Sequence, residues 1–166
     1  MTSSKSLKPK SSPFKNFDPA AAEKKICRFI QKEVQNSGAN GVILGLSGGI
    51  DSVLVAVLSA KALGSKKVCA LFFYVADNKE ENAVFESDDF RDAFALSESL
   101  CVSFEKINLG TLFKSAQKTL VIADNANANT NGNTNANTNT HPLSPVLSGN
   151  LVSRLRMSLL YYYANQ

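Results

Sequence analysis

The first apolar pattern in the chain predicts an amphipathic helix. Asp18-Pro19 is typical of a helix start, because an Asp side chain can cap free N–H groups and proline fits the first turn. Gly38 is expected to end the helix, since glycine readily adopts the left-handed conformation of a C-cap. Apolar residues between these ends recur at helical spacing and are expected to share one face, namely Ile26, Phe29, Ile30 and Val34.

Short apolar runs alternate with helical patterns in the next part of the chain. The expected strands cover residues 41–46, 67–75 and 102–109, and the expected helices cover residues 51–63, 89–100 and 110–121. The acidic and polar stretch 77–87 between two of these elements is expected to be a loop. Strands that alternate with helices predict an α/β fold, in which a doubly wound parallel sheet is covered by helices on both faces.

The composition changes abruptly near residue 124. Asn occupies every odd position from 125 to 139, and the even positions hold Ala, Thr or Gly. Neither face of such a tract is apolar, so we expect a solvated, low-complexity insertion over about 124–140 within a domain that spans residues 18–166. After Pro145, one more apolar stripe predicts a final helix, and its members are Leu151, Leu155, Leu159 and Tyr162.

The net charge of +4 changes this picture little, because the excess lies in residues 1–17, which contain lysines and no acid. This tail is rich in Ser, Lys and Pro, so we expect it to be disordered. The rest of the chain is neutral, and no apolar run approaches the roughly 18 residues of a membrane helix. The tail also lacks the apolar core of a secretory signal. We therefore expect a cytoplasmic protein that binds neither nucleic acid nor membranes.

The segment most suggestive of chemistry joins a predicted strand to a predicted helix, and it reads Gly45-Leu46-Ser47-Gly48-Gly49-Ile50-Asp51-Ser52. Its glycines let the backbone approach a ligand closely, and the N–H groups at a helix start attract anions. Ser47 and Ser52 add hydroxyl donors. An acid in a phosphate site is reasonable if Asp51 holds a magnesium ion that screens the phosphates. The pattern therefore favours nucleotide binding over a plain glycine-rich turn, although neither a Walker lysine nor GxGxxG spacing is present.

The order strand–SGGxDS–helix resembles the signature of the N-type ATP pyrophosphatases, which attack the α-phosphate of ATP and release pyrophosphate. A second segment narrows the resemblance: GNLVSRLRM and the following SLLYYYAN are similar to the GNxxARxRM–LLYYxAN helix of the NAD synthetase family. The one departure in that motif is Ser153, where the family usually has Ala. The resemblance covers residues 18–75 and 149–166 well, and residues 88–115 as a pattern.

The resemblance implies an adenine nucleotide alpha hydrolase-like fold and the amidation of deamido-NAD with ammonia. ATP activates the substrate as an acyl-adenylate, and AMP and pyrophosphate are released. The cofactors implied are ATP and Mg²⁺. The segment Gly45–Ser52 would cradle the pyrophosphate, Asp51 would hold the magnesium, and Arg154 would contact deamido-NAD. The family also implies a homodimer. Arg154 and Arg156 lie roughly 200° apart around a helix axis, so we expect a surface or interface role for Arg156.

No residue of this chain is assigned as catalytic. The family's further magnesium-binding acid and phosphate-binding lysines have no match in this sequence, so we expect an N-terminal part of an ammonia-dependent enzyme that is inactive alone. Two alternatives stay open. One is another amidating or thiolating ATP pyrophosphatase, and the other is a non-catalytic nucleotide-binding remnant.

Overall fold

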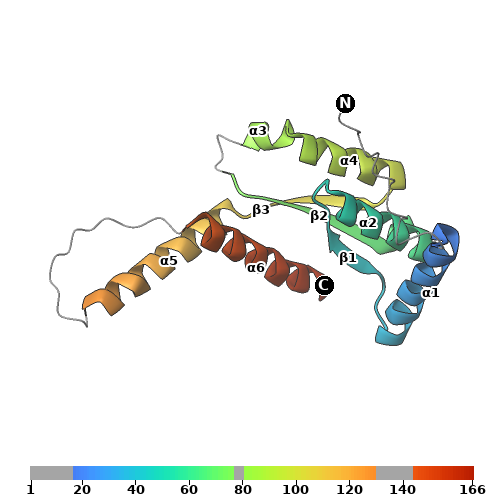
Figure 1. Cartoon of the computed structure of the whole chain (residues 1–166), viewed down its shortest axis with the longest axis horizontal. Coiled ribbons are helices and arrows are strands. Elements are labelled where there is room, and N and C mark those ends of the chain that lie inside the picture. The colour runs from blue at the N-terminus through green and yellow to red at the C-terminus, as the bar shows by residue number, and fades with distance from the viewer. Residues whose placement is uncertain (1–16, 77–80, 130–143) are drawn as a thin grey trace, which may run out of the picture.

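The computed structural model describes residues 17–76, 81–129 and 144–166, with the side chains of 121–129 left out (Figure 1). The predicted tail and most of the Asn-rich tract lie outside these residues. The elements in chain order are α1 (Pro19–Ser37), β1 (Val42–Gly45), α2 (Ile50–Leu63), the short 3₁₀ helix η1 (Ser65–Lys67), β2 (Val68–Tyr74), α3 (Glu81–Phe85), α4 (Asp88–Leu100), β3 (Ser103–Asn108), α5 (Gly110–Asn129) and α6 (Pro145–Ala164).

The strands form a three-stranded parallel sheet in the order β1-β2-β3. Gly45 pairs with Leu71, and Phe73 pairs with Ile107, so the carboxyl ends of the strands lie along one edge. The central strand β2 is largely buried, which matches its continuous apolar sequence. The predicted strands and their parallel arrangement are therefore confirmed.

Helices cover the sheet on both faces, as predicted. On one face, Leu46 and Phe72 pack with Ala56 of α2 and Ala93 of α4. On the other face, α6 covers the buried side chains of Leu71, Phe73 and Leu109, and Figure 1 shows α4 and α6 on opposite sides of the sheet. The residues of α6 that make this contact are Val152, Leu159, Leu160 and Tyr163.

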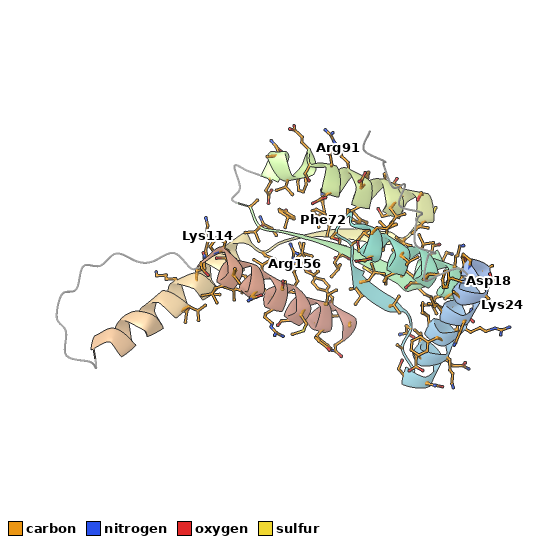
Figure 2. All side chains as sticks on the ribbon, viewed as in Figure 1. Asp18, Lys24, Phe72, Arg91, Lys114 and Arg156 are labelled. Atoms are coloured by element: carbon orange, nitrogen blue, oxygen red, sulfur yellow. The ribbon has the colours of Figure 1, made fainter. Side chains whose placement is uncertain are left out.

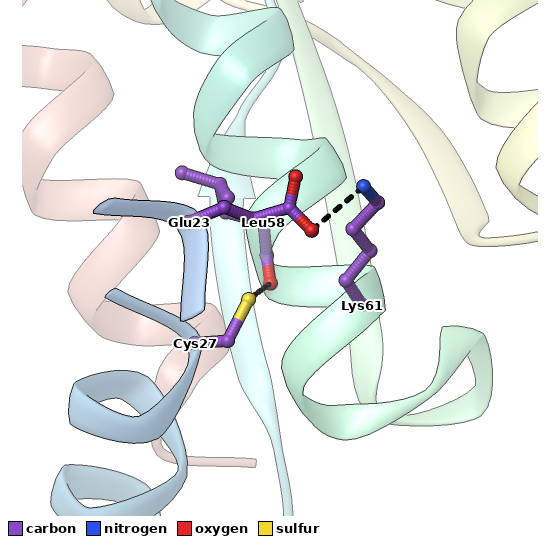
Figure 3. A network of polar contacts seen from close by, with 4 residues as sticks. All are labelled: Glu23, Cys27, Leu58 and Lys61. Atoms are coloured by element: carbon purple, nitrogen blue, oxygen red, sulfur yellow. Dashed lines mark hydrogen bonds and ion pairs between the residues drawn. The ribbon is translucent and has the colours of Figure 1, made fainter. Parts of the chain in front are cut away.

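Helix α1 packs against α2 instead of the sheet. Figure 3 shows two of the polar contacts, an ion pair of 2.9 Å between Glu23 and Lys61 and a 3.7 Å hydrogen bond from the Cys27 thiol to the Leu58 carbonyl. The predicted caps are confirmed, since Asp18 accepts hydrogen bonds from two backbone N–H groups and Gly38 has a φ of 68°.

The predicted apolar face of α1 is wrong in part. Ile26 and Phe29 remain 40% and 61% exposed, whereas Ile30 and Val34 are partly buried. The reason lies in the packing partner, because a second helix covers a narrower stripe than a sheet does.

Two further element boundaries differ from the prediction. The stretch expected to be a loop contains α3, although residues 77–80 lie outside the described part. Helix α3 is stabilised by contacts with distant residues: Glu81 accepts hydrogen bonds from Tyr74 and Asn108, and the Phe85 ring packs against Tyr74. Helix α5 continues to Asn129, into the Asn-rich tract, because extending an existing helix through alanines costs little free energy.

Within the described residues, no helix combines the length and the mean hydropathy that a membrane span needs.

Candidate functional site

The candidate loop begins where β1 leaves the sheet. The Leu46 N–H donates to the Leu71 carbonyl over 2.9 Å, and after this bond the chain turns away toward α2. Gly48 has a φ of 78°, and a Cβ atom there would lie 2.5 Å from the Asp89 carbonyl oxygen. The glycine at 48 is therefore required by the fold itself, both by its backbone conformation and by the close approach of α4.

Two serines hold the loop against the first turn of α2. The Ser52 hydroxyl accepts from the Ser47 N–H at 3.2 Å and donates to the Gly49 carbonyl at 2.8 Å. The hydroxyl oxygens of Ser47 and Ser52 are 3.1 Å apart. The serines predicted as ligand donors thus bond to each other and to the loop backbone, which gives the loop a defined shape.

Gly49 is the N-cap of α2 and has ordinary extended backbone angles, φ −73° and ψ 150°. Among the described residues, a Cβ atom at this position would meet the Ser47 hydroxyl at 3.5 Å, an ordinary contact. The fold therefore does not require glycine here. The first N–H groups of a helix have no acceptor within the helix and carry the positive end of its dipole. Because Gly49 has no side chain, an anion could approach these N–H groups closely.

Asp51 lies in the first turn of α2 and its side chain is exposed. No cluster of three or more His, Cys, Asp or Glu residues occurs in the described part of the chain, so a complete protein cage for a metal is absent there. Magnesium commonly binds through one or two carboxylates together with substrate phosphates and water. An exposed carboxylate beside an anion-binding helix start fits that donor set.

A pocket of about 280 Å³ opens beside the loop at the carboxyl ends of β1 and β2. The described strands lie in the order β1-β2-β3, and α6 contacts β1. In open α/β sheets, ligands bind in the crevice outside the carboxyl ends of the strands, which is where this pocket lies. The pocket is lined by Gly45, Leu46, Ser47, Phe72, Phe73, Asp89 and Arg156.

Of the two arginines on α6, the structure brings Arg156 to this pocket. Its Nη2 donates to the Phe73 carbonyl at 3.4 Å, and Figure 2 shows Arg156 on the side of α6 that faces the sheet. Arg154 is exposed. The predicted separation of the two side chains around the helix is therefore confirmed. Of the surface or interface role predicted for Arg156, the surface role is wrong, and an interface role stays a prediction. The contact of Arg154 with a substrate stays a prediction.

The role expected for Arg156 followed from the assignment of Arg154 to the substrate, and the expected apolar stripe of α6 did not correct it. Tyr162 was expected on the packed face, yet it is 60% exposed, and Tyr163 packs on the sheet instead. The packed face is turned by roughly a quarter turn from the expected stripe. Val152, Arg156 and Leu160 follow one another at i, i+4 spacing, and this pattern in the sequence could have identified the arginine.

A polar network borders the site at the ends of β2 and β3. The Tyr74 hydroxyl donates to Glu81 at 3.0 Å, and the Asn108 side-chain amide donates to the same carboxylate at 2.8 Å. Burial, and then the hydrogen bond to Glu81 and its charge, raise the pKa of Tyr74. Tyr74 therefore remains a hydrogen-bond donor at neutral pH, and the network holds the start of α3 to the sheet.

Comparison with known proteins shows where this architecture recurs. The family model described as NAD synthase matches residues 22–166. An NH(3)-dependent NAD(+) synthetase of Archaeoglobus fulgidus is 34% identical over 150 residues, which are 90% of this chain and 49% of that protein. The chain spans about half the length of the curated relatives it matches.

Two solved structures are similar in fold. An NH3-dependent NAD synthetase from Campylobacter jejuni, in complex with a nitrate ion, has a TM-score of 0.68 and 32% identity, and the match covers 90% of this chain and 53% of that one. An NMN synthetase from Francisella tularensis has a TM-score of 0.64 and 28% identity, with coverage of 91% and 52%.

Proposed function

This chain belongs to the NAD synthase family, and we propose that it takes part in the ATP-dependent amidation of deamido-NAD with ammonia. The observation that carries the proposal is the loop Ser47–Ser52, which lies at the carboxyl edge of a parallel sheet and presents a bare helix start. The names of the relatives, NH(3)-dependent NAD(+) synthetase, support the substrates. Because the chain spans about half of those relatives, the activity of the whole enzyme is itself part of the proposal.

The roles of the loop residues follow from their positions. The backbone N–H groups at the start of α2 bind the pyrophosphate part of ATP, and Gly49 lets the phosphates approach. Asp51 would hold Mg²⁺ together with the phosphates, and the ion would supply positive charge to the leaving pyrophosphate. The nicotinate carboxylate attacks the α-phosphorus and displaces pyrophosphate, giving an acyl-adenylate. Ammonia then attacks the acyl carbon, loses a proton and displaces AMP.

The remaining parts of the proposal concern α6. Arg154 is exposed on the helix, on the side away from Arg156. We assign it a contact with deamido-NAD that is made outside the pocket at the carboxyl ends of β1 and β2. Tyr161 and Tyr162 leave 68% and 60% of their surface exposed on the same helix. Aromatic residues exposed together favour association, which supports the homodimer that the family resemblance implies.

A second candidate function is the amidation of a mononucleotide. The structural similarity to an NMN synthetase supports it, because the loop would serve either substrate. Another amidating or thiolating ATP pyrophosphatase, or a non-catalytic nucleotide-binding module, would also retain the loop. These candidates differ in the substrate that they bind besides ATP and in whether they form a product. The experiment therefore measures ATP binding first and product formation second.

The test uses the purified 166-residue chain, with ATP affinity measured by calorimetry in the presence and absence of Mg²⁺. We expect weak, magnesium-dependent ATP binding that falls at least about tenfold in Asp51→Asn, because the ion loses its carboxylate ligand. The proposal would be contradicted if no binding were detected at millimolar ATP. It would also be contradicted if neither removal of Mg²⁺ nor the Asp51→Asn substitution altered the ATP affinity.

The second arm adds ammonium and either deamido-NAD or the corresponding mononucleotide, and measures product formation. The described residues offer one phosphate loop and no cluster of three or more metal-binding side chains, and adenylation needs charge neutralised from several sides, so we expect no sustained NAD formation by this chain alone. Steady turnover that disappears in Asp51→Asn would show that these residues suffice.

A further inference from the structure

Arg156 occupies an unusual position where the sheet opens. The Leu71 carbonyl accepts a hydrogen bond from Leu46 of the neighbouring chain segment. The Phe73 carbonyl, two residues further along β2, points in the same direction because backbone groups alternate along a strand. At that level β1 has already turned into the loop, and the Arg156 Nη2 supplies the donor instead, at 3.4 Å. The guanidinium thus stands where the next residue of β1 would have paired.

The guanidinium is poorly paired for a group of its charge. It has five N–H donors, and the bond to Phe73 is long for a hydrogen bond. Its Nε is buried and has no acceptor among the described residues. The ion pairs found in the described part of the chain join Glu23 to Lys61 and Asp88 to Arg91, so no carboxylate lies within ion-pair distance of Arg156 there, although Asp89 lines the same pocket. A partly buried guanidinium that lacks a direct ion pair keeps donors free for an anion that binds beside it.

The surroundings of the guanidinium indicate which anion. Arg156 lines the pocket together with Gly45 and Ser47, at the sheet end of the loop, whereas Asp51 lies at its helix end. This step rests on the proposed function, in which the helix start binds the pyrophosphate part of ATP. The incompletely paired Arg156 then makes the sheet end of the loop the favoured place for the next phosphate along the nucleotide. That phosphate is the α-phosphate, where the substrate carboxylate attacks.

We infer that Arg156 binds the α-phosphate of ATP while its contact with the Phe73 carbonyl fixes the guanidinium at the open end of β1. The donors that Phe73 does not use are available to the phosphate oxygens. In this position the guanidinium neutralises the charge that develops on the α-phosphate during attack.

The experiment compares ATP with inorganic pyrophosphate as ligands of the full 166-residue chain. For Arg156→Gln and Arg156→Lys, we expect ATP affinity to fall at least about tenfold and pyrophosphate affinity to stay within about twofold, since pyrophosphate lacks the α-phosphate. Lysine keeps the charge but lacks the planar fork of donors with which a guanidinium holds two acceptors in fixed positions. The control is Arg91→Gln, which removes an exposed positive charge on α4 far from Arg156 (Figure 2) and should leave both affinities unchanged.

The outcomes separate this inference from the proposed function. If the unaltered chain binds ATP and the Arg156 variants bind it equally well, the inference is wrong and the proposed function stands. If both ligands weaken equally, Arg156 does not select the α-phosphate. If the unaltered chain binds no ATP, both fail.

A spectroscopic arm covers the case in which the variants do not fold. In the unaltered chain, the Nε–H cross-peak of Arg156, assigned through bonds, should shift on addition of ATP and stay in place on addition of pyrophosphate. An Nε–H signal unmoved by saturating ATP would overturn the inference without any substitution.

Discussion

Gly48 and Gly49 are adjacent in the sequence, but the structure needs only the first of them for folding. Gly48 combines a φ of 78° with the close approach of the Asp89 backbone, whereas Gly49 has backbone angles open to any residue. A glycine at the start of a helix lets a ligand come close to the backbone N–H groups. Because backbone strain does not require Gly49, we attribute this glycine to ligand approach.

This difference gives a matched pair of substitutions. Gly49→Ala should lower the melting temperature by only about 2–4 °C, because alanine is a poorer N-cap than glycine, yet lower ATP affinity at least about tenfold, because the new methyl group meets the phosphates. Gly48→Ala should cost about 2 kcal/mol of folding free energy through strain. Thermal melts and calorimetry on both variants check this. Full ATP affinity in Gly49→Ala would mean that no ligand passes over this residue.

The sequence located the loop but not its arginine, and the reason is physical. The loop residues are contiguous, so strand, turn and helix patterns place Ser47 and Asp51 together without any knowledge of packing. Arg156 comes to the loop only because α6 crosses the other face of the sheet, and that crossing depends on which of two overlapping apolar stripes becomes buried. Leu159 belongs to both stripes, and the sequence alone does not choose between them.

At the scale of elements, caps were predictable because they are local, and α3 was not. The Asp18 cap of α1 depends on N–H groups two and three residues away. The short α3 depends on Asn108, 27 residues from Glu81, and on aromatic contacts of Phe85. A five-residue helix has little stability of its own, so its existence is decided by tertiary contacts.

The end of α4 carries a strained residue that offers a test of this view. Cys101 is the C-cap and has a φ of 53°, in the left-handed region that glycine tolerates best. Cys101→Gly should therefore stabilise the chain and raise the free energy of unfolding by about 1 kcal/mol. This corresponds to an increase of roughly 2–4 °C in melting temperature for a chain of this size. Cys101→Ala is the control, since it removes the thiol and keeps the strain. An equal gain in both variants would trace the effect to the thiol instead.

At the scale of the whole molecule, the Asn-rich tract lies largely outside the described residues, so its contribution must be measured. We expect removal of residues 131–139 to leave folding and ATP affinity unchanged, because the segment has no apolar side chain to bury beyond one alanine and loop length changes closure entropy only slowly. Circular dichroism melts and calorimetry on the shortened chain check this. A fall of many degrees in melting temperature would show that the tract packs against the domain.

Docking of α6 joins parts of the chain that are synthesised far apart in time. Arg156 and Phe73 are separated by 83 residues, whereas the parallel pairs of the sheet close over much shorter stretches. Long-range contacts form late, and a chain emerging from the ribosome folds its earlier segments first. The face formed by Leu71, Phe73 and Leu109 is therefore bare on the nascent chain until α6 arrives. An uncovered apolar sheet face is prone to aggregation and is a surface that chaperones bind. Docking of α6 therefore completes the pocket and, in the same step, removes this aggregation-prone surface.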